Sequence, residues 1–326
     1  MPEPIIEIKN LSVYFYTYAG IVKAIEDVSF DIYRGETLAL VGETGCGKSV
    51  TSRAITKLIE SPGRIVNGQV IYHKEDGSTV DLLKLSEEEI RQIKGNEIAY
   101  IFQDPHSSLD PLYTVGYQIS EAMEVHGKIK NIKEGMPKAV QILREVLIPD
   151  PENRVKNYPH ELSGGMKQRV VIGIGIANNP RLLIADEPTT ALDVTVQEQI
   201  LELLNELKRK YNATVLLITH NLGVVAETAQ RVVVMYAGKV VEIGTVDQIF
   251  KNPLHPYTSA LLKAVPNPLR QIEKLESIPG TVPNLITPPK GCRFHPRCPF
   301  ATEICRKEVP ELKEIEPGHF VACHRY

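Results

Sequence analysis

The chain has 326 residues, a formal net charge of −3, and a composition that is 43% hydrophobic and 24% charged. This length exceeds the usual single core, so we expect one large domain and a smaller one. The balanced charge gives no field that would attract nucleic acid, and no apolar run approaches the roughly 20 residues that a membrane-spanning helix needs. The N-terminal residues show no secretory signal pattern, so we expect a protein of the reducing cytoplasm.

Short apolar or alternating runs predict strands along the first 240 residues, and helical patterns lie among them from about Gly47 onward. Several of these runs are apolar on both faces, which is typical of a parallel sheet covered by helices. The predicted fold class is therefore α/β. The runs are "IIEIKNLSV", "VSFDI", "TLALV", "EIAYIF", "RLLIADE", "TVLLITH" and "RVVVMY".

The segment "GETGCGKS" at residues 42–49 follows "TLALV" and precedes the helical pattern "KSVTSRAITKLI". It fits glycine, four residues, glycine, lysine and serine, a loop whose backbone amides bind phosphate oxygens at a helix N-terminus. We expect Lys48 to reach the outer phosphates and the Ser49 hydroxyl to hold Mg²⁺. The alternative is a glycine-rich turn with a surface lysine. The residues expected at the nucleotide are Gly42, Gly45, Cys46, Gly47, Lys48, Ser49 and Val50.

From about Leu112 to about Leu147 the pattern turns helical and polar, which predicts an inserted helical piece whose first helix runs over 114–125. Farther along, the apolar run "LLIADE" ends in Asp186 and Glu187. A strand that ends in an acid is typical of a metal ligand beside a phosphate loop, so we expect Asp186 to hold Mg²⁺. Glu187 is then expected to act as general base on the attacking water.

Between the phosphate loop and these acids lies "LSGGMKQR" at residues 162–169. Together with Gln103 in "IFQDP", "ALD" at 191–193 and His220 in "LLITH", this octet resembles the ATP-binding subunits of ABC transporters over about residues 5–250. The resemblance implies a P-loop ABC-type ATPase core with an inserted helical subdomain at about 104–178.

In that family the octet closes over the ATP of a facing subunit, so two ATP molecules join two ATPase subunits. Ser163 and the amides of Gly164 and Gly165 open a helix, which is a donor-rich anion site. The resemblance also implies that Gln103 touches Mg²⁺ and the water. Asp193 would lie at the subunit boundary, and His220 would contact the terminal phosphate.

The family stacks adenine on an aromatic side chain shortly after the first strand, where this chain has "VYFYTY". Phe15 falls on that position and Tyr16 is next. Simple packing on the sheet is the alternative for either ring.

The character of the chain changes near residue 253, where prolines in "NPLHPY", "VPNP", "IPGTVP" and "TPPKG" interrupt any regular element. We therefore expect an ATPase domain at 1–252 and a small irregular Cys-rich domain at 253–326.

The stretches "IFQDPHSSLDPLYTVGYQI", "YPHELSGGMKQRV", "NPLHPYTSALLKAVP" and "GCRFHPRCP" resemble the dipeptide and oligopeptide importers. The resemblance implies a peripheral ATPase at the cytoplasmic face of the membrane that hydrolyses ATP to power peptide import. Its partners would be two permeases, a related second ATPase and, indirectly, an external binding protein. Dipeptides, oligopeptides and nickel stay open as the solute. A soluble ABC ATPase acting on DNA or ribosomes is the alternative, and an iron–sulfur sensor with a vestigial ATPase is a third.

Four of the five cysteines lie in the last 35 residues: Cys292, Cys298, Cys305 and Cys323. A cytoplasmic protein argues against disulfides. The gaps of five, six and seventeen residues are wider than a zinc knuckle needs, whereas a [4Fe-4S] cluster tolerates them and Cys-Pro recurs at such clusters. We expect a structural cluster that offsets the ordering entropy of the tail. Zinc, unligated thiols or a shell that includes His295, His319 or His324 stay open.

Overall fold

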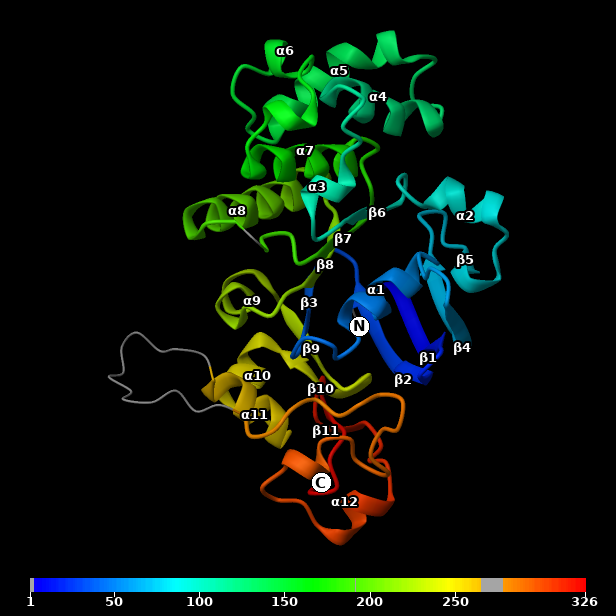
Figure 1. Ribbon diagram of the computed structural model, residues 1–326, viewed down its shortest axis with the longest axis vertical. Coiled ribbons are helices and arrows are strands. Elements are labelled where there is room, and N and C mark those ends of the chain that lie inside the picture. Colours follow the sequence, from blue (N-terminus) through cyan, green and yellow to red (C-terminus); the bar gives the residue numbers. More distant parts are fainter. Residues whose placement is uncertain (1–2, 191, 265–277) are drawn as a thin grey trace. The chain divides into compact units, whose positions relative to one another are not determined.

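The computed structural model describes residues 3–190, 192–264 and 278–326 (Figure 1). The chain divides into two compact units, which we call unit 1 (Met1–Lys84 and Ile218–Tyr326) and unit 2 (Leu85–Leu217). Ala191 of the "ALD" motif and the "VPNP" segment at 265–268 lie outside the described residues. Among the described residues, no helix has the length and apolar content needed to span a bilayer.

Unit 1 contains an antiparallel sheet in the order β2-β1-β4-β5. Strands β1 and β2 form a long hairpin, and β4 pairs with the other edge of β1. The bounds are β1 (Pro4–Thr17), β2 (Gly20–Tyr33), β4 (Gly63–His73) and β5 (Thr79–Asp81).

A second set of strands in unit 1 has the order β11-β12-β10-β9-β3. β3 is parallel to β9 and all five of its residues are buried, in keeping with the largely apolar run "TLALV". β12 of the tail pairs antiparallel with β10, so the tail extends this sheet. The bounds are β3 (Thr37–Val41), β9 (Arg231–Tyr236), β10 (Lys239–Thr245), β11 (Lys313–Glu316) and β12 (His319–Val321).

The helices of unit 1 are short, and the one after the phosphate loop is shorter than the sequence pattern predicts. α1 (Lys48–Ile55) ends because Lys57 adopts φ 52°. Leu58 N then donates to Arg53 O at 2.8 Å and Lys57 N to Ala54 O at 3.1 Å, which is a Schellman cap. The others are η1 (Leu82–Lys84), α9 (Leu222–Thr228), α10 (Val246–Lys251), α11 (Pro256–Lys263), η3 (His295–Arg297) and α12 (Glu303–Lys307).

Unit 2 contains β7 (Leu182–Asp186), β6 (Ile98–Ile101) and all but the last residue of β8 (Thr214–Ile218). The strand order is β8-β7-β6, with β6 parallel to β7. α4 begins where the sequence predicts, because Thr114 caps it by accepting from Tyr117 N at 3.3 Å. Helices α4 to α7 lie together (Figure 1, green). The helices are α2 (Glu87–Ile93), α3 (Pro105–Ser108), α4 (Val115–Val125), α5 (Ile132–Glu145), α6 (Pro151–Arg154), η2 (Pro159–Glu161), α7 (Gly164–Ile176) and α8 (Val194–Tyr211).

Within unit 1, a buried carboxylate ties the tail (253–326) to β10. Glu242 of β10 is 0% exposed and accepts from the backbone N–H groups of Leu254 and His255 at 2.8 and 2.9 Å. His319 Nε2 of β12 lies 2.8 Å from the same carboxylate. These bonds satisfy a charge that would otherwise be costly to bury, and they fix the chain at the start of α11 and at β12.

The buried His255 predicts a pH dependence of stability. Burial lowers its pKa from 6.5 to about 3, so the folded protein keeps it neutral while the unfolded chain protonates it below pH 6.5. Its Nδ1 caps α11 by accepting from Tyr257 N at 3.0 Å, a bond that asparagine can also make. Between about pH 7.5 and about pH 5.5, the wild type should lose about 1.4 kcal/mol more unfolding free energy than His255→Asn. Urea titrations at both pH values measure the difference, and equal losses in the two proteins would contradict it.

Candidate active site

The phosphate loop of unit 1 connects the end of β3 to the start of α1, as the sequence predicts. Gly42 and Gly47 have φ angles of 149° and 95°, and a Cβ on Gly42 would lie 2.2 Å from the carbonyl oxygen of Met235. A Cβ on Gly47 would lie 2.8 Å from the carbonyl oxygen of Ala24. Backbone packing therefore requires glycine at both positions.

Lys48 is the first residue of α1, and its side chain turns back over the loop. It is 5% exposed, and its Nζ donates to the carbonyl oxygens of Gly42 at 2.9 Å and Glu43 at 3.2 Å. Gly47 brings no side-chain cap to α1. An ammonium group at an uncapped helix N-terminus is a setting that can bind phosphate. Ser49 and Val50 follow in the first turn and are half-buried, whereas Cys46 is buried and its N–H donates to Glu43 O at 3.2 Å.

His220 belongs to the same unit as the phosphate loop. It is exposed and lies two residues after the end of β8. Its neighbour Thr219 donates through its backbone N–H to the carbonyl oxygen of Leu40 at 3.4 Å, on the strand that leads into the loop. His220 therefore lies beyond the carboxyl ends of strands, where α/β proteins build their ligand sites.

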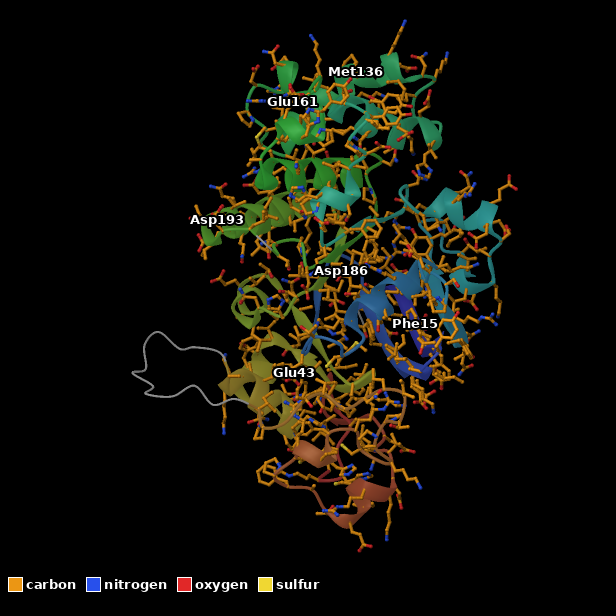
Figure 2. The ribbon with its side chains drawn as sticks, viewed as in Figure 1. Phe15, Glu43, Met136, Glu161, Asp186 and Asp193 are labelled. Atoms are coloured by element: carbon orange, nitrogen blue, oxygen red, sulfur yellow. The ribbon has the colours of Figure 1, made fainter. Side chains whose placement is uncertain are left out.

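In unit 2 the structure brings Gln103, Asp186 and Glu187 together. Asp186, labelled in Figure 2, ends β7 and is 1% exposed. It accepts a hydrogen bond from the Tyr100 hydroxyl at 2.7 Å. Glu187 has φ 46°, an uncommon value for a residue other than glycine. Gln103 Nε2 and Thr190 Oγ1 both donate to Glu187 Oε2, at 2.8 and 3.0 Å. The predicted metal ligand and the predicted base thus have oriented carboxylates.

Sequence reasoning missed Tyr100 and Thr190. Tyr100 lies opposite Ile184 in the parallel β6–β7 pair, so only the strand register places its hydroxyl near the end of β7. Thr190 lies three residues after Glu187, and its backbone N–H donates to Glu187 O at 3.1 Å. A tight turn after "ADE" would have been the available signal.

Two capped helix N-termini form the second part of the site in unit 2. Ser163 is exposed and caps α7 by accepting from Met166 N at 3.3 Å. Asp193, labelled in Figure 2, caps α8 by accepting from Val196 N at 3.0 Å. A Cβ on Gly165 would lie 2.9 Å from a methyl group of Val196, so the first turns of the two helices are in contact; Gly164 is half-buried beside it. The exposed start of α7 can receive an anion.

The two aromatic candidates for adenine differ in their surroundings. Phe15 of β1, labelled in Figure 2, is half-buried. A Cβ on Gly63 would lie 2.7 Å from its ring, so the ring packs against that glycine. Tyr16 is 45% exposed, and the Arg64 guanidinium lies 5.5 Å from its ring centroid. Either ring can offer a face to a base.

The four tail cysteines are free and half-buried, and each lies within electrostatic reach of others of the set. Burial raises the pKa of Cys292 to about 11 and also raises the pKa of Cys298 and of Cys323. Cys292 N donates to Cys305 O at 2.9 Å. In the described part of the chain, no three His, Cys, Asp or Glu side chains are placed to hold a single metal ion.

The histidines near these cysteines bond protein oxygens. His319 Nε2 lies 2.8 Å from the Glu242 carboxylate, and His324 Nε2 lies 2.9 Å from the carbonyl oxygen of Glu308. His295 Nδ1 lies 2.9 Å from the carbonyl oxygen of Cys292. Each of these three histidines therefore has a protein oxygen as a hydrogen-bonding partner.

Comparisons with known proteins agree with the resemblance seen in the sequence. A family model described as "ABC transporter" matches residues 25–190, and one described as "Oligopeptide/dipeptide transporter, C-terminal region" matches residues 241–305. The chain is 49% identical over 323 residues to the "Probable peptide ABC transporter ATP-binding protein y4tR" of Sinorhizobium fredii, covering 98% of this chain and 95% of that protein. It is 49% identical over 318 residues to the "Dipeptide transport ATP-binding protein DppD" of Lactococcus lactis, covering 98% and 90%.

The fold also matches a solved structure. It is described as a "Dimeric structure of a post-hydrolysis state of the ATP-binding cassette MJ0796 bound to ADP and Pi", with a TM-score of 0.65 and 26% identity. The match covers 74% of this chain and 98% of that one.

Proposed function

The chain belongs to the ABC transporter family of ATP-binding proteins and is an ATPase of that type, and from this premise we propose that it powers the import of dipeptides or oligopeptides. The observation that carries the proposal is the match of residues 241–305 to the oligopeptide/dipeptide transporter C-terminal region. That region lies outside the ABC transporter match at 25–190, so it adds information about the kind of transporter.

The phosphate loop and the oriented carboxylates support specific roles. Lys48 and the backbone of 42–50 would bind the outer phosphates, and Ser49, Gln103 and Asp186 would hold Mg²⁺. Bound Mg²⁺ neutralises charge on the phosphates. Glu187, oriented by Gln103 and Thr190, would take a proton from the attacking water.

Two further groups would contact the two ends of the nucleotide. His220 would contact the terminal phosphate from its position after β8. Phe15 would stack on adenine, with Tyr16 as its neighbour in the same segment.

We further propose that ATP joins two ATPase subunits. The exposed N-terminus of α7 at Ser163, Gly164 and Gly165 would close over nucleotide held by a facing subunit, and Asp193 would lie at that boundary. Binding would then favour the closed pair, and hydrolysis would remove that contact. The similar MJ0796 cassette is described as dimeric and bound to ADP and Pi, which supports this arrangement.

The proposed partners are two membrane permeases, a related second ATPase and, indirectly, an external peptide-binding protein. The chain would lie at the cytoplasmic face of the membrane and bind no nucleic acid. Purification from the native membrane tests this assembly. We expect the permeases to co-purify and peptide-loaded binding protein to stimulate ATP turnover; co-purification with ribosomes instead would favour a soluble ABC ATPase.

We also propose that 253–326 is a small Cys-rich domain in which Cys292, Cys298, Cys305 and Cys323 hold a [4Fe-4S] cluster. Four free, half-buried thiols support the donor set, and a bound cationic centre would keep them deprotonated. Such a cluster would crosslink a segment that has few regular elements. Zinc is the other cofactor that thiolates would take.

Anaerobically purified protein should contain about four iron atoms and about four sulfides per chain. Cys298→Ser should lose most of this iron, whereas Cys46→Ser in the phosphate loop should keep it. Iron and sulfide analysis with absorption spectra before and after dithionite gives the readout. Stoichiometric zinc without sulfide would contradict the cluster and support the zinc alternative.

A further inference from the structure

An arginine of the tail forms an ion pair with the phosphate loop. Arg297 ends η3, directly before Cys298, and Glu43 is the second residue of "GETGCGKS". Arg297 Nη1 donates to Glu43 Oε2 at 2.7 Å and Nη2 donates to Oε1 at 3.1 Å. The Arg297 side chain is only 5% exposed, so solvent screens this two-pronged pair weakly.

Each nitrogen of this guanidinium has a partner in unit 1. Besides the two bonds to Glu43, Nη1 donates to the Tyr236 hydroxyl at 3.3 Å, Nη2 to Ile278 O at 3.2 Å and Nε to Pro279 O at 2.7 Å. Five bonds in fixed directions leave one orientation for the group. A lysine, with three donors at a single nitrogen, cannot reproduce this arrangement.

A second tail-side residue holds the backbone of Glu43. Tyr257 of α11 is 0% exposed, and its hydroxyl accepts from Glu43 N at 2.8 Å. Its ring packs against Tyr236 and Phe294, with centroids 4.6 and 5.4 Å apart. Glu43 is thus fixed through both its N–H and its carboxylate by residues that lie more than two hundred positions later in the chain.

Glu43 in turn adjoins the lysine that would bind phosphate. Its carbonyl oxygen accepts from Lys48 Nζ at 3.2 Å. Its carboxylate places a negative charge in a loop that would bind a polyanion, and like charges repel each other in a partly buried site. The Arg297 guanidinium neutralises that charge and keeps the carboxylate at η3.

We infer that Arg297 is a positioning residue for nucleotide binding: it holds and neutralises Glu43, so the folded Cys-rich tail sets the affinity of the phosphate loop for ATP. The inference rests on the proposed role of 42–49 as the phosphate site. By linkage, nucleotide binding should stabilise the tail to the same degree.

Binding of Mg-ATP to the full chain, measured by fluorescence titration with a labelled nucleotide and by KM and kcat, tests the inference. Arg297→Gln leaves the Glu43 charge uncompensated, so we expect Kd and KM to rise at least about tenfold while kcat changes less than about threefold. Arg297→Lys keeps the positive charge but loses the two-pronged contact with Glu43, so Kd and KM should rise less than in Arg297→Gln. Arg325→Gln, a tail arginine whose guanidinium lies over the Phe300 ring, is the matched control and should bind as wild type.

Removing the Glu43 charge as well distinguishes charge neutralisation by Arg297 from a general contribution of Arg297 to folding. Adding Glu43→Gln to Arg297→Gln should restore Kd to within about threefold of wild type, because the repulsion of phosphate is gone. Wild-type binding by Arg297→Gln, or no recovery in the double variant, would overturn the inference alone. Lys48→Ala should lose nucleotide in every background; if it binds as wild type, the proposed phosphate site is wrong and the inference falls with it.

Discussion

Glu187→Gln should abolish ATP turnover while Mg-ATP binding stays close to wild type. The substitution keeps the size of the side chain, so Gln103 and Thr190 retain a hydrogen-bonding partner at residue 187. It removes the carboxylate that would accept the proton, and a positioned general base typically contributes about 10² to 10⁴ in rate. We therefore expect turnover to fall at least about 100-fold, with Kd changed less than about threefold. Steady-state phosphate release and nucleotide titration measure the two quantities.

Thr190→Val provides the matched control for this prediction. Valine keeps the shape of threonine but removes the hydroxyl that donates to Glu187 at 3.0 Å. The carboxylate remains but loses one of its orienting bonds, so turnover should fall by only about tenfold. If Glu187→Gln turns over ATP at the wild-type rate, Glu187 is not the base.

Ser163→Asp should also stop turnover, but through the facing subunit. Aspartate caps helices as well as serine does, and a negative charge suits a helix N-terminus, so α7 should remain stable. The same charge would face the triphosphate of the neighbouring subunit and repel it. We expect turnover to fall at least about 100-fold, with binding by the chain's own phosphate loop unchanged. The same two assays give the readout, on the assembled ATPase pair.

Ser163→Asn is the neutral counterpart of this variant. Asparagine has nearly the shape of aspartate and caps helices equally well, so it separates charge from size and from capping. It should retain turnover to within about tenfold of wild type. Equal turnover by the aspartate and asparagine variants would mean that no phosphate approaches the start of α7.

The parts of the site that could be predicted depend on short sequence distances. The phosphate loop combines an apolar strand, glycines with constrained backbone angles and a following helix within about twenty residues. Its conformation can therefore be predicted from the local sequence. The start of α4 was equally visible, because Thr114 is a capping residue ahead of an apolar pattern. Such features arise from the residues at the position itself.

The features that could not be predicted depend on strand order and long-range packing. Tyr100 reaches Asp186 because β6 and β7 are adjacent, which a single sequence does not state. The tail joins the rest of unit 1 through the pairing of β12 with β10 and through the ion pair of Arg297 with Glu43, which lie 254 positions apart in the sequence. The sequence marked the tail as irregular and rich in cysteine, but no local pattern indicates that its arginine would fold onto the phosphate loop.

The proposed sandwich of ATP between two ATPase subunits is tested most directly by crosslinking in the Glu187→Gln protein. A photocrosslinker placed at residue 163 would be activated with and without saturating Mg-ATP, and the crosslinked peptides identified by mass spectrometry. We predict that Mg-ATP produces crosslinks from residue 163 to the phosphate loop of the facing ATPase subunit, and that ADP does not. Crosslinks that are absent with Mg-ATP, or equally abundant without nucleotide, would contradict the account.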